Sequence, residues 1–451
     1  MEVPQNPCRN MSRRSFLGTV AGAATLTGPV VALGEDGLDA LSQTITIDSK
    51  LRVRKADLAL LDPIADLAEE LGNKVDLSRG VSWEVTDSQG RAVAWTREEV
   101  ANLGEGTYTL TYTLEDRLGN KVIVNRSLEV YADEPARGEG EWVRLWGQTA
   151  LDTMQRIVRA DGVFADGRGG YAVVASSEGY WDALSAAGLA GLLKAPVLIT
   201  PSKSLAPQTR EELERLQPEH IVLMGGTAAV SEGVEREIGG YATKGDVVRV
   251  WGQNAPATAV DALDAANEMG FRWNDTCIVA TVSGFWDALS IAPYAYAMGM
   301  PILLNEANGA LSDATAAAIK AHRFKHSIIV GGPDSVPTGV RAQLIGAGAG
   351  IPLRLAGDTA IDTSAEIARY EILRGMEVTN MCVADGRGWW DALCGAALAG
   401  AQNSVLVLSN PDNYTAVDAV YAPGDKALEE GHILGGRDAV PATTEDYLNG
   451  R

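Results

Sequence analysis

The strongest constraint in this sequence is a pattern that occurs three times. Each copy opens with an Arg followed two residues later by a Trp or Ala and then Gly, continues with a Trp-Asp-Ala-Leu tetrad, and ends with a Gly-Gly pair. The arginines are Arg144, Arg249 and Arg354. The tetrads begin at Trp181, Trp286 and Trp390, and the glycine pairs at Gly225, Gly331 and Gly435. Because these anchors drift by at most one residue over a period of about 105 residues, the chain contains three copies of one structural unit.

Within each copy, short apolar runs alternate with segments of helical periodicity. In the first copy the runs are VRLWG, YAVVAS, PVLIT and HIVLMGG, and helices are expected over 149–160, 182–193 and 207–216. Continuous apolar strands joined by helical crossovers favour a parallel sheet with helices on its faces. We therefore expect an α/β fold of three tandem doubly wound repeats of the Rossmann/Toprim-like kind, in which the four strands of each copy form one sheet.

The order of these motifs resembles the cell wall binding repeat 2 family. The resemblance covers residues 142–451 and places the repeats at 142–247, 248–352 and 353–451. It implies an exported protein of a Gram-positive bacterium, whose repeats form a pseudo-threefold unit and bind an anionic wall polymer non-covalently. The chain departs from the family in two respects. Trp replaces the usual Pro before Asp-Ala-Leu, and the third copy has SVLV at 404–407 where Pro-x-Leu-Leu is usual.

Residues 1–34 are interpreted as an export signal. Arg13 and Arg14 stand before a run of apolar and small residues at 16–33. This arrangement resembles a twin-arginine (Tat) signal peptide, with a general secretory signal or a membrane anchor as alternatives. No other apolar stretch approaches the roughly 18 residues that span a bilayer. We expect a secreted protein at the cell wall or cell surface, without membrane contact in its mature form.

Residues 43–133 alternate apolar and polar positions with a period of two, most clearly at 106–131, within a β domain placed at 35–133. One face is expected to carry Tyr108, Leu110, Tyr112 and Leu114. A turn at 87–90 separates two further strands, so an antiparallel sandwich with one buried face is predicted. The last hairpin resembles bacterial immunoglobulin-like surface domains, which implies a spacer or adhesive module. Residues 134–141 are expected to form a linker.

Net charge argues against nucleic acid and anionic lipid as partners, and the missing motifs argue against a bound metal or nucleotide. The formal net charge is −21, which repels nucleic acid and anionic lipid. Cys8 lies in the expected signal, which leaves Cys277, Cys382 and Cys394. No Cys pair or Cys/His cluster has the spacing of metal ligands, and the Gly-Gly pairs lack the Gly-Lys-Ser/Thr ending of a phosphate-binding loop. We therefore expect neither a metal nor a cofactor.

The tetrad aspartates Asp182, Asp287 and Asp391 are the first candidates for chemistry. A carboxylate at the end of a strand can act as a general base, or it can cap a helix by accepting backbone amide protons. No His or Ser recurs beside all three aspartates. The histidines expected at or near the opposite end of the sheets are His220, His322, His326 and His432. We therefore predict that the aspartates are structural helix caps and that the chain is not an enzyme.

Two recurring sets of side chains are candidate polymer contacts. The tryptophans Trp181, Trp286 and Trp390 are either large core residues, which we favour, or exposed platforms for sugar rings. The arginines of the three copies suit bidentate recognition of phosphate or carboxylate groups, but pairing with acids of their own domain is the simpler interpretation. Both sets are kept as candidates.

The glycine pairs supply a third candidate. The second glycines, Gly226, Gly332 and Gly436, precede expected helix N-termini, where backbone amides create positive potential for an anion. These features predict a surface protein held on an anionic secondary wall polymer by three weak sites, which gain about 10²- to 10⁴-fold together by avidity. Other surface proteins are a second class of partner. A self-assembling surface-layer protein and a secreted α/β enzyme or small-ligand binder remain alternatives.

Overall fold

The computed structural model describes residues 26–27, 43–54, 81–95, 103–104, 106–115, 121–131, 141–411, 413–421 and 427–450. They belong to two units, an N-terminal one that extends to residue 134 and a C-terminal one that contains nearly all later residues. The predicted signal residues Arg13 and Arg14 lie outside the described residues. Among the helices that are described, none has the length and apolar character needed to cross a membrane.

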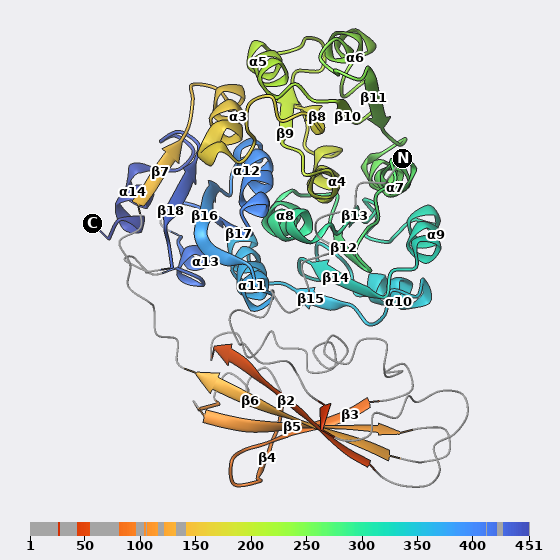
Figure 1. The fold of residues 1–451 in the computed structure, drawn as a ribbon, viewed down its shortest axis with the longest axis vertical. Helices are drawn as coiled ribbons and strands as arrows, with labels where there is room; N and C mark the ends of the chain where they lie inside the picture. The colour runs from red at the N-terminus through yellow and green to blue at the C-terminus, as the bar shows by residue number, and fades with distance from the viewer. Residues whose placement is uncertain are drawn as a thin grey trace. The chain divides into compact units, whose positions relative to one another are not determined.

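The N-terminal unit contains one six-stranded sheet with the order β1-β2-β6-β5-β3-β4 (Figure 1). Its strands are β1 (Leu26–Thr27), β2 (Gln43–Arg54), β3 (Val81–Thr86), β4 (Ala92–Val93), β5 (Gly106–Glu115) and β6 (Lys121–Tyr131). Neighbouring strands are antiparallel except β2 and β6, which are parallel. The predicted β domain is therefore a small, mainly antiparallel sheet, and the described strands do not include the second sheet of a sandwich.

Alternating burial along β5 and β6 confirms the predicted period of two. Tyr108, Leu110 and Tyr112 are buried, whereas the residues between them are not. The side chain of Leu114 lies outside the described residues. The predicted turn at 87–90 joins β3 to β4, which pair antiparallel. One face of this sheet is thus buried and mainly apolar, with Arg126 of β6 as a buried exception, and the other face is more exposed.

The C-terminal unit contains three four-stranded sheets with one common strand order, and every pair of neighbours is parallel. Sheet I is β11 (Asp246–Val250), β10 (His220–Met224), β8 (Tyr171–Ser176) and β9 (Val197–Thr200). Sheet II is β15 (Leu353–Leu355), β14 (His326–Val330), β12 (Thr276–Ala280) and β13 (Ile302–Leu304). Sheet III is β7 (Glu141–Leu145), β18 (Glu430–Leu434), β16 (Glu377–Asp385) and β17 (Ser404–Ser409). The predicted parallel α/β architecture is confirmed.

The first strand of each copy lies in the sheet of another copy. Strand β11 opens the second copy but pairs with β10 in sheet I, and β15 opens the third copy but pairs with β14 in sheet II. Strand β7 opens the first copy and pairs with β18 of the third copy in sheet III. The expectation that the four strands of one copy form one sheet is therefore wrong. This exchange links each copy to the next and closes the three copies into a ring.

Helices cover these sheets and connect the strands. They are α3 (Ala150–Arg159), α4 (Ala186–Leu193), α5 (Pro207–Leu216), α6 (Glu232–Gly239), α7 (Ala255–Glu268), α8 (Trp286–Met298), α9 (Asp313–His322), α10 (Gly339–Gly346), α11 (Ala360–Leu373), α12 (Trp390–Ala401), α13 (Thr415–Asp418) and α14 (Ala442–Leu448). The short 3-10 turns η6 (Ala160–Gly162) and η7 (Ala183–Ser185) follow α3 and precede α4. The helix predicted at 207–216 matches α5.

Helices α4, α8 and α12 pack against one another at the centre of the C-terminal unit (Figure 1). Their sequences are rich in Ala, with Gly in α4 and α12, and most of their residues are buried, as expected of a core helix. The small residues let the backbones approach closely. A Cβ at Gly191 of α4 would lie 2.1 Å from the carbonyl oxygen of Tyr296 in α8. This contact between the first two copies therefore requires glycine.

The variant Gly191→Ala is expected to lower the free energy of unfolding by about 1–3 kcal/mol, because the added methyl group overpacks the contact between α4 and α8. Gly346→Ala is the matched control, since a Cβ at this exposed helix position meets no described heavy atom within 4 Å. The control should gain a few tenths to about 1 kcal/mol from helix propensity. Urea unfolding measures both variants, and equal effects would contradict the packing argument.

Candidate polymer-binding edge

The Gly-aromatic-Trp-Asp loops of the three copies meet at the carboxyl ends of β8, β12 and β16. Each loop carries two adjacent aromatic residues: Tyr180 and Trp181, Phe285 and Trp286, or Trp389 and Trp390. The ring of Tyr180 contacts Phe285 and Trp389, with centroids 5.4 and 6.3 Å apart. Within each pair the rings lie 4.5–4.9 Å apart at 27–32°. Three loops that are far apart in sequence thus form one aromatic cluster.

The two members of each pair differ in exposure. The inner residues are partly or largely covered, and Trp389 is 7% exposed. The outer residues Trp181, Trp286 and Trp390 are 51%, 37% and 39% exposed. The favoured interpretation of these three tryptophans as core residues is therefore wrong. The residue before each tryptophan fills the centre instead, and the tryptophan ring stacks on it from outside.

Two of the outer tryptophans also reach the next copy. Trp286 Nε1 donates to the Gly386 carbonyl at 2.5 Å, and Trp390 Nε1 donates to the Ser177 carbonyl at 2.8 Å. The first bond joins the second copy to the third, and the other joins the third copy to the first. Trp181 makes no equivalent bond to any residue that the structure describes. These tryptophans therefore hold neighbouring loops together while one side of each ring stays open to solvent.

The predicted helix caps are not formed by hydrogen bonds. Asp182 stands before η7 with its backbone in the αR region, and no cap bond from its side chain is found. Asp287 and Asp391 are the second residues of α8 and α12, one position past the start, and no side-chain cap bond opens either helix in the described structure. A capping residue needs an extended backbone so that its side chain can turn back to the helix amides. The prediction of capping is therefore wrong.

Each aspartate instead contacts the first glycine of a Gly-Gly pair. A Cβ at Gly225 would lie 2.6 Å from Asp182 Oδ2, and the same distance is 2.3 Å at Gly331 and 2.4 Å at Gly435, which face Asp287 and Asp391. These glycines have φ values of +97° to +103°, a region that other residues rarely adopt. The Asp-loop and the Gly-Gly loop are therefore packed together at the carboxyl edge of every sheet.

Burial raises the pKa of these carboxyl groups. Burial is the first cause at all three positions, and it brings the pKa of Asp287 to about 6. The pKa of Asp391 is also raised to about 6, with a smaller contribution from the Asp385 carboxylate. At Asp182, a hydrogen bond from Thr258 partly offsets the upward shift in pKa. The aspartates therefore favour their protonated form more strongly in the folded than in the unfolded chain.

The double variant Asp287→Asn/Asp391→Asn is expected to gain stability over the wild type as the pH rises. The folded pKa of about 6 exceeds the unfolded pKa of about 4, so ionisation costs folding free energy that grows between these values and is constant above them. The cost is about 2–3 kcal/mol per aspartate, and Asn does not bear it. Urea unfolding at about pH 4 and about pH 7 measures the difference. A difference between variant and wild type that stays constant with pH would contradict this account.

The three arginines bind the Gly-Gly loops from inside the protein. Their Nη1 atoms donate to the first glycine carbonyl of a pair at 2.5–2.9 Å: Arg144 to Gly435, Arg249 to Gly225 and Arg354 to Gly331. Arg144 also forms an ion pair with Glu445 at 2.9 Å, and Arg249 with Glu235 at 2.7 Å. Only 11% and 12% of these two side chains are exposed. Their geometry favours a structural role over direct contact with a polymer.

Arg354 differs from the other two arginines. Its Nη2 donates to the Val336 carbonyl at 2.8 Å, and it has no ion pair among the described residues. Arg341 occupies the position in α10 that Glu235 occupies in α6. Burial lowers the pKa of Arg354, but a guanidinium remains charged at any physiological pH. Arg354 is therefore the one arginine of the three that has no ion-pair partner among the described residues.

The second glycines do not stand at helix N-termini. Helix α6 begins at Glu232, six residues after Gly226, and α10 and α14 begin similarly late after Gly332 and Gly436. A separate turn intervenes, in which the amides of Ala229 and Val230 donate to the Gly226 carbonyl. The predicted anion site on a helix N-terminus is therefore wrong, because the residues directly after each second glycine form a turn and the helix begins only after it.

Two further tryptophans cover the glycine loops. Trp251 Cε3 lies 3.4 Å from a Cβ built at Gly226, and Trp146 Cε3 lies 3.7 Å from one at Gly436. The two rings are 54% and 52% exposed. Ala356 holds the corresponding position in the third copy. These tryptophans belong to the repeated Arg motif in the sequence, but the motif does not indicate that their rings are exposed.

Exposed tryptophans thus concentrate at the carboxyl ends of strands in all three sheets. We call this set the tryptophan edge: Trp146, Trp181, Trp251, Trp286 and Trp390. Five of the seven large hydrophobic side chains exposed in the described residues are tryptophans, and all five follow the carboxyl ends of β7, β8, β11, β12 and β16. The other two are Ile345 and Ile351. Fold and edge together define a binding module made of three α/β repeats in a closed ring.

Comparison with known families identifies this module. The cell wall binding domain 2 (CWB2) family matches three segments of the chain, at residues 144–235, 249–341 and 354–445. The chain therefore belongs to the CWB2 family. It is a cell wall-associated surface protein with three cell wall binding domains. The resemblance found in the sequence is confirmed for the three repeats, whereas the N-terminal unit has no family assigned to it.

Two proteins of Bacillus subtilis (strain 168) are similar in sequence. One is the N-acetylmuramoyl-L-alanine amidase LytC, 29% identical over 279 residues, which are 61% of this chain and 52% of the relative. The other is the "Amidase enhancer", 32% identical over 267 residues, which are 59% of this chain and 35% of the relative. The chain thus spans about half or less of these relatives.

Two solved structures from Clostridium difficile share the fold. Cwp6 matches with a TM-score of 0.59 and 15% identity, over 79% of this chain and 61% of that one. Cwp8 matches with a TM-score of 0.59 and 18% identity, over 89% of this chain and 68% of that one. At these identities the two structures support the architecture of the chain.

Proposed function

We propose that this protein is exported and held non-covalently on an anionic secondary polymer of the cell wall, with the tryptophan edge as its contact surface. The N-terminal β unit acts as a spacer or adhesive module, and the chain carries no catalytic activity of its own. The observation that carries this proposal is the concentration of exposed tryptophans at the carboxyl edges of the three sheets.

Tryptophan suits the recognition of a glycan. Its ring offers a large apolar face for the C–H groups of a sugar ring, and its N–H supplies one polar contact at the rim. A surface that gathers such rings is costly to leave in water unless a partner covers it. Trp146, Trp181 and Trp251 keep about half of their surface exposed. The edges therefore supply the adhesive part of the binding surface.

Charge decides how an anionic polymer approaches the ring. The chain carries a net charge of −21, so its average surface repels a polyanion. The loop beside Arg354 and Arg341 in sheet II is a local exception, because no acid of the described residues pairs with Arg354. We expect aromatic stacking to supply most of the affinity and this loop to orient the anionic groups.

The experiment is a titration of tryptophan fluorescence with purified secondary wall polymer. We expect quenching that saturates, with an affinity that stays constant or rises when salt is increased to about 0.5 M, because salt screens the net repulsion. Affinity that falls steeply with salt would show that cationic contacts dominate and would overturn the role given to the tryptophans. No change in fluorescence at any polymer concentration would overturn the proposal itself.

The sequence relatives favour a second candidate function. One is named as an amidase and the other as an amidase enhancer. The β unit could then serve a wall amidase as a docking or stimulating partner at the polymer. A pull-down of a wall amidase by the isolated repeats and by the full chain distinguishes the two functions, since only the full chain should capture the amidase in the second case.

A further inference from the structure

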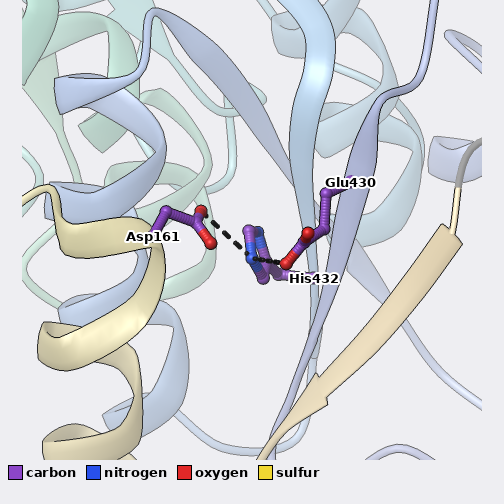
Figure 2. Close-up of side chains that lie close together, drawn as sticks. All are labelled: Asp161, Glu430 and His432. Atoms are coloured by element: carbon purple, nitrogen blue, oxygen red, sulfur yellow. Dashed lines mark ion pairs between the residues drawn. The ribbon is translucent and has the colours of Figure 1, made fainter.

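We propose that Asp161, Glu430 and His432 bind one divalent transition-metal ion, such as Zn²⁺. Figure 2 shows the three side chains converging from two parts of the chain. Glu430 and His432 lie on β18 of sheet III, and Asp161 lies in η6, directly after α3 of the first copy. A metal here would join the first copy to the third, at the place where β7 also closes the ring.

The three side chains have the spacing of ligands that share one ion. His432 Nε2 lies 3.2 Å from Asp161 Oδ2 and 3.6 Å from Glu430 Oε1. Three ligand atoms, one from each residue, lie within 4.8 Å of one another. Two donors bound to the same Zn²⁺ at about 2.1 Å are roughly 3–4 Å apart, so small shifts would complete the geometry. Imidazole with carboxylates is a donor set that suits Zn²⁺ better than Mg²⁺.

His432 supplies an independent reason to expect a ligand. Its side chain is 0% exposed, and neither ring nitrogen makes a hydrogen bond with acceptable geometry. The equivalent strand positions are occupied by Val222 in β10 and Ile328 in β14, so the fold accepts an aliphatic residue there. Burying an imidazole without hydrogen bonds costs free energy that an aliphatic residue avoids. A bound metal would offset this cost.

The surroundings allow the ion to enter and orient one ligand. The side chains of Asp161 and Glu430 are 24% and 47% exposed, which leaves the site open on one side for entry and for water ligands. Gln402 Nε2 donates to Asp161 Oδ2 at 2.7 Å and fixes that carboxylate. His432 Nδ1 has no acceptor among the described residues. A missing partner of this kind costs about 10- to 100-fold in affinity, so we expect micromolar binding.

The test is Zn²⁺ binding to the purified full chain, measured by isothermal titration and by metal content after gel filtration. The wild type should bind one Zn²⁺ at this site and show a higher Tm with Zn²⁺ than with EDTA. His432→Val should fold, because Val222 holds the same position in sheet I. We expect it to bind Zn²⁺ more weakly than the wild type by at least about 100-fold, the upper end of what loss of an outer partner costs.

His326→Gln is the matched control, since it removes an exposed imidazole from the strand position that Glu430 holds in sheet III. This variant should bind Zn²⁺ like the wild type. Asp161→Asn should weaken binding and keep the left-handed backbone of this residue, with φ +52°, which Asn tolerates. Equal Zn²⁺ binding by the wild type and His432→Val, or no Zn²⁺ binding by the wild type, would overturn the proposal. In either case the three side chains would contact only one another.

Discussion

Replacing Trp146 and Trp251 together by alanine is expected to weaken binding to wall polymer by about 30-fold. Each exposed ring is taken to contribute about 1 kcal/mol of stacking, and about 1.4 kcal/mol corresponds to a tenfold change in affinity. The folded state should persist, because Ala356 holds the same position in the third copy. The measurement is titration of the variant with purified polymer, alongside its unfolding curve.

The control for this prediction is the pair Ile345→Ala and Ile351→Ala. These residues are 46% and 71% exposed. Their replacement by alanine therefore removes exposed apolar surface that does not belong to the tryptophan edge. Their polymer affinity should match that of the wild type. If the isoleucine variant loses as much affinity as the tryptophan variant, the contact is non-specific and the tryptophan edge is not the binding surface.

The variant Arg249→Ala is expected to lower the free energy of unfolding by about 3 kcal/mol. The guanidinium binds the Gly225 carbonyl at 2.7 Å and Glu235 at 2.7 Å, and its side chain is 12% exposed. Truncation leaves a partly buried carboxylate and a carbonyl without their partner, which costs more than loss of an exposed pair. Urea unfolding measures the loss.

Arg210→Ala supplies the comparison. Arg210 of α5 pairs with Glu237, which lies on α6 as Glu235 does, but both side chains of this pair are 42% exposed. An exposed pair of this kind contributes about 0–1 kcal/mol. Under conditions in which Arg249→Ala is still folded, we expect its polymer affinity to be unchanged. A variant with normal stability and lost affinity would show instead that Arg249 contacts the polymer.

Much of the fold follows from sequence period and hydrophobic pattern. The repeated apolar runs predicted parallel strands, and the helix at 207–216 agrees with α5 because Pro207 can open a helix and the following apolar positions keep helical spacing. The alternation of Tyr108, Leu110 and Tyr112 likewise predicted a half-buried strand. These features are local, and local patterns determine which element forms.

Where each copy begins and ends in space could not be predicted from the period. A repeat read cyclically has the same spacing whichever strand comes first, so the pattern is identical whether β11 closes sheet I or opens sheet II. The pairing of β11 with β10 depends on hydrogen bonds between strands that are not adjacent in the chain, and the period of the sequence does not determine it. The boundary predicted between residues 247 and 248 falls inside β11 for this reason.

The sequence indicates which residues line the site, but it does not predict the roles of the aspartates and tryptophans correctly. Aspartate after a strand suggests a helix cap. Capping requires an extended backbone at that residue, which the sequence does not show, and the backbone of Asp182 is in the αR region instead. The tryptophans are exposed because Tyr180, Phe285 and Trp389 fill the centre, and the meeting of three loops is a tertiary event. The sequence does not reveal the cluster of Asp161, Glu430 and His432, because Asp161 is far in sequence from the other two and the fold alone brings it beside β18.

The most direct test of the central claim is cosedimentation of the mature protein with wall sacculi, before and after acid removal of the secondary polymers. We expect the protein to sediment with untreated sacculi and to remain in solution with stripped sacculi, and the tryptophan double variant to bind untreated sacculi more weakly. Sedimentation without sacculi would instead support self-assembly. Binding to neither preparation, or equal binding to both, would contradict anchoring through a secondary wall polymer.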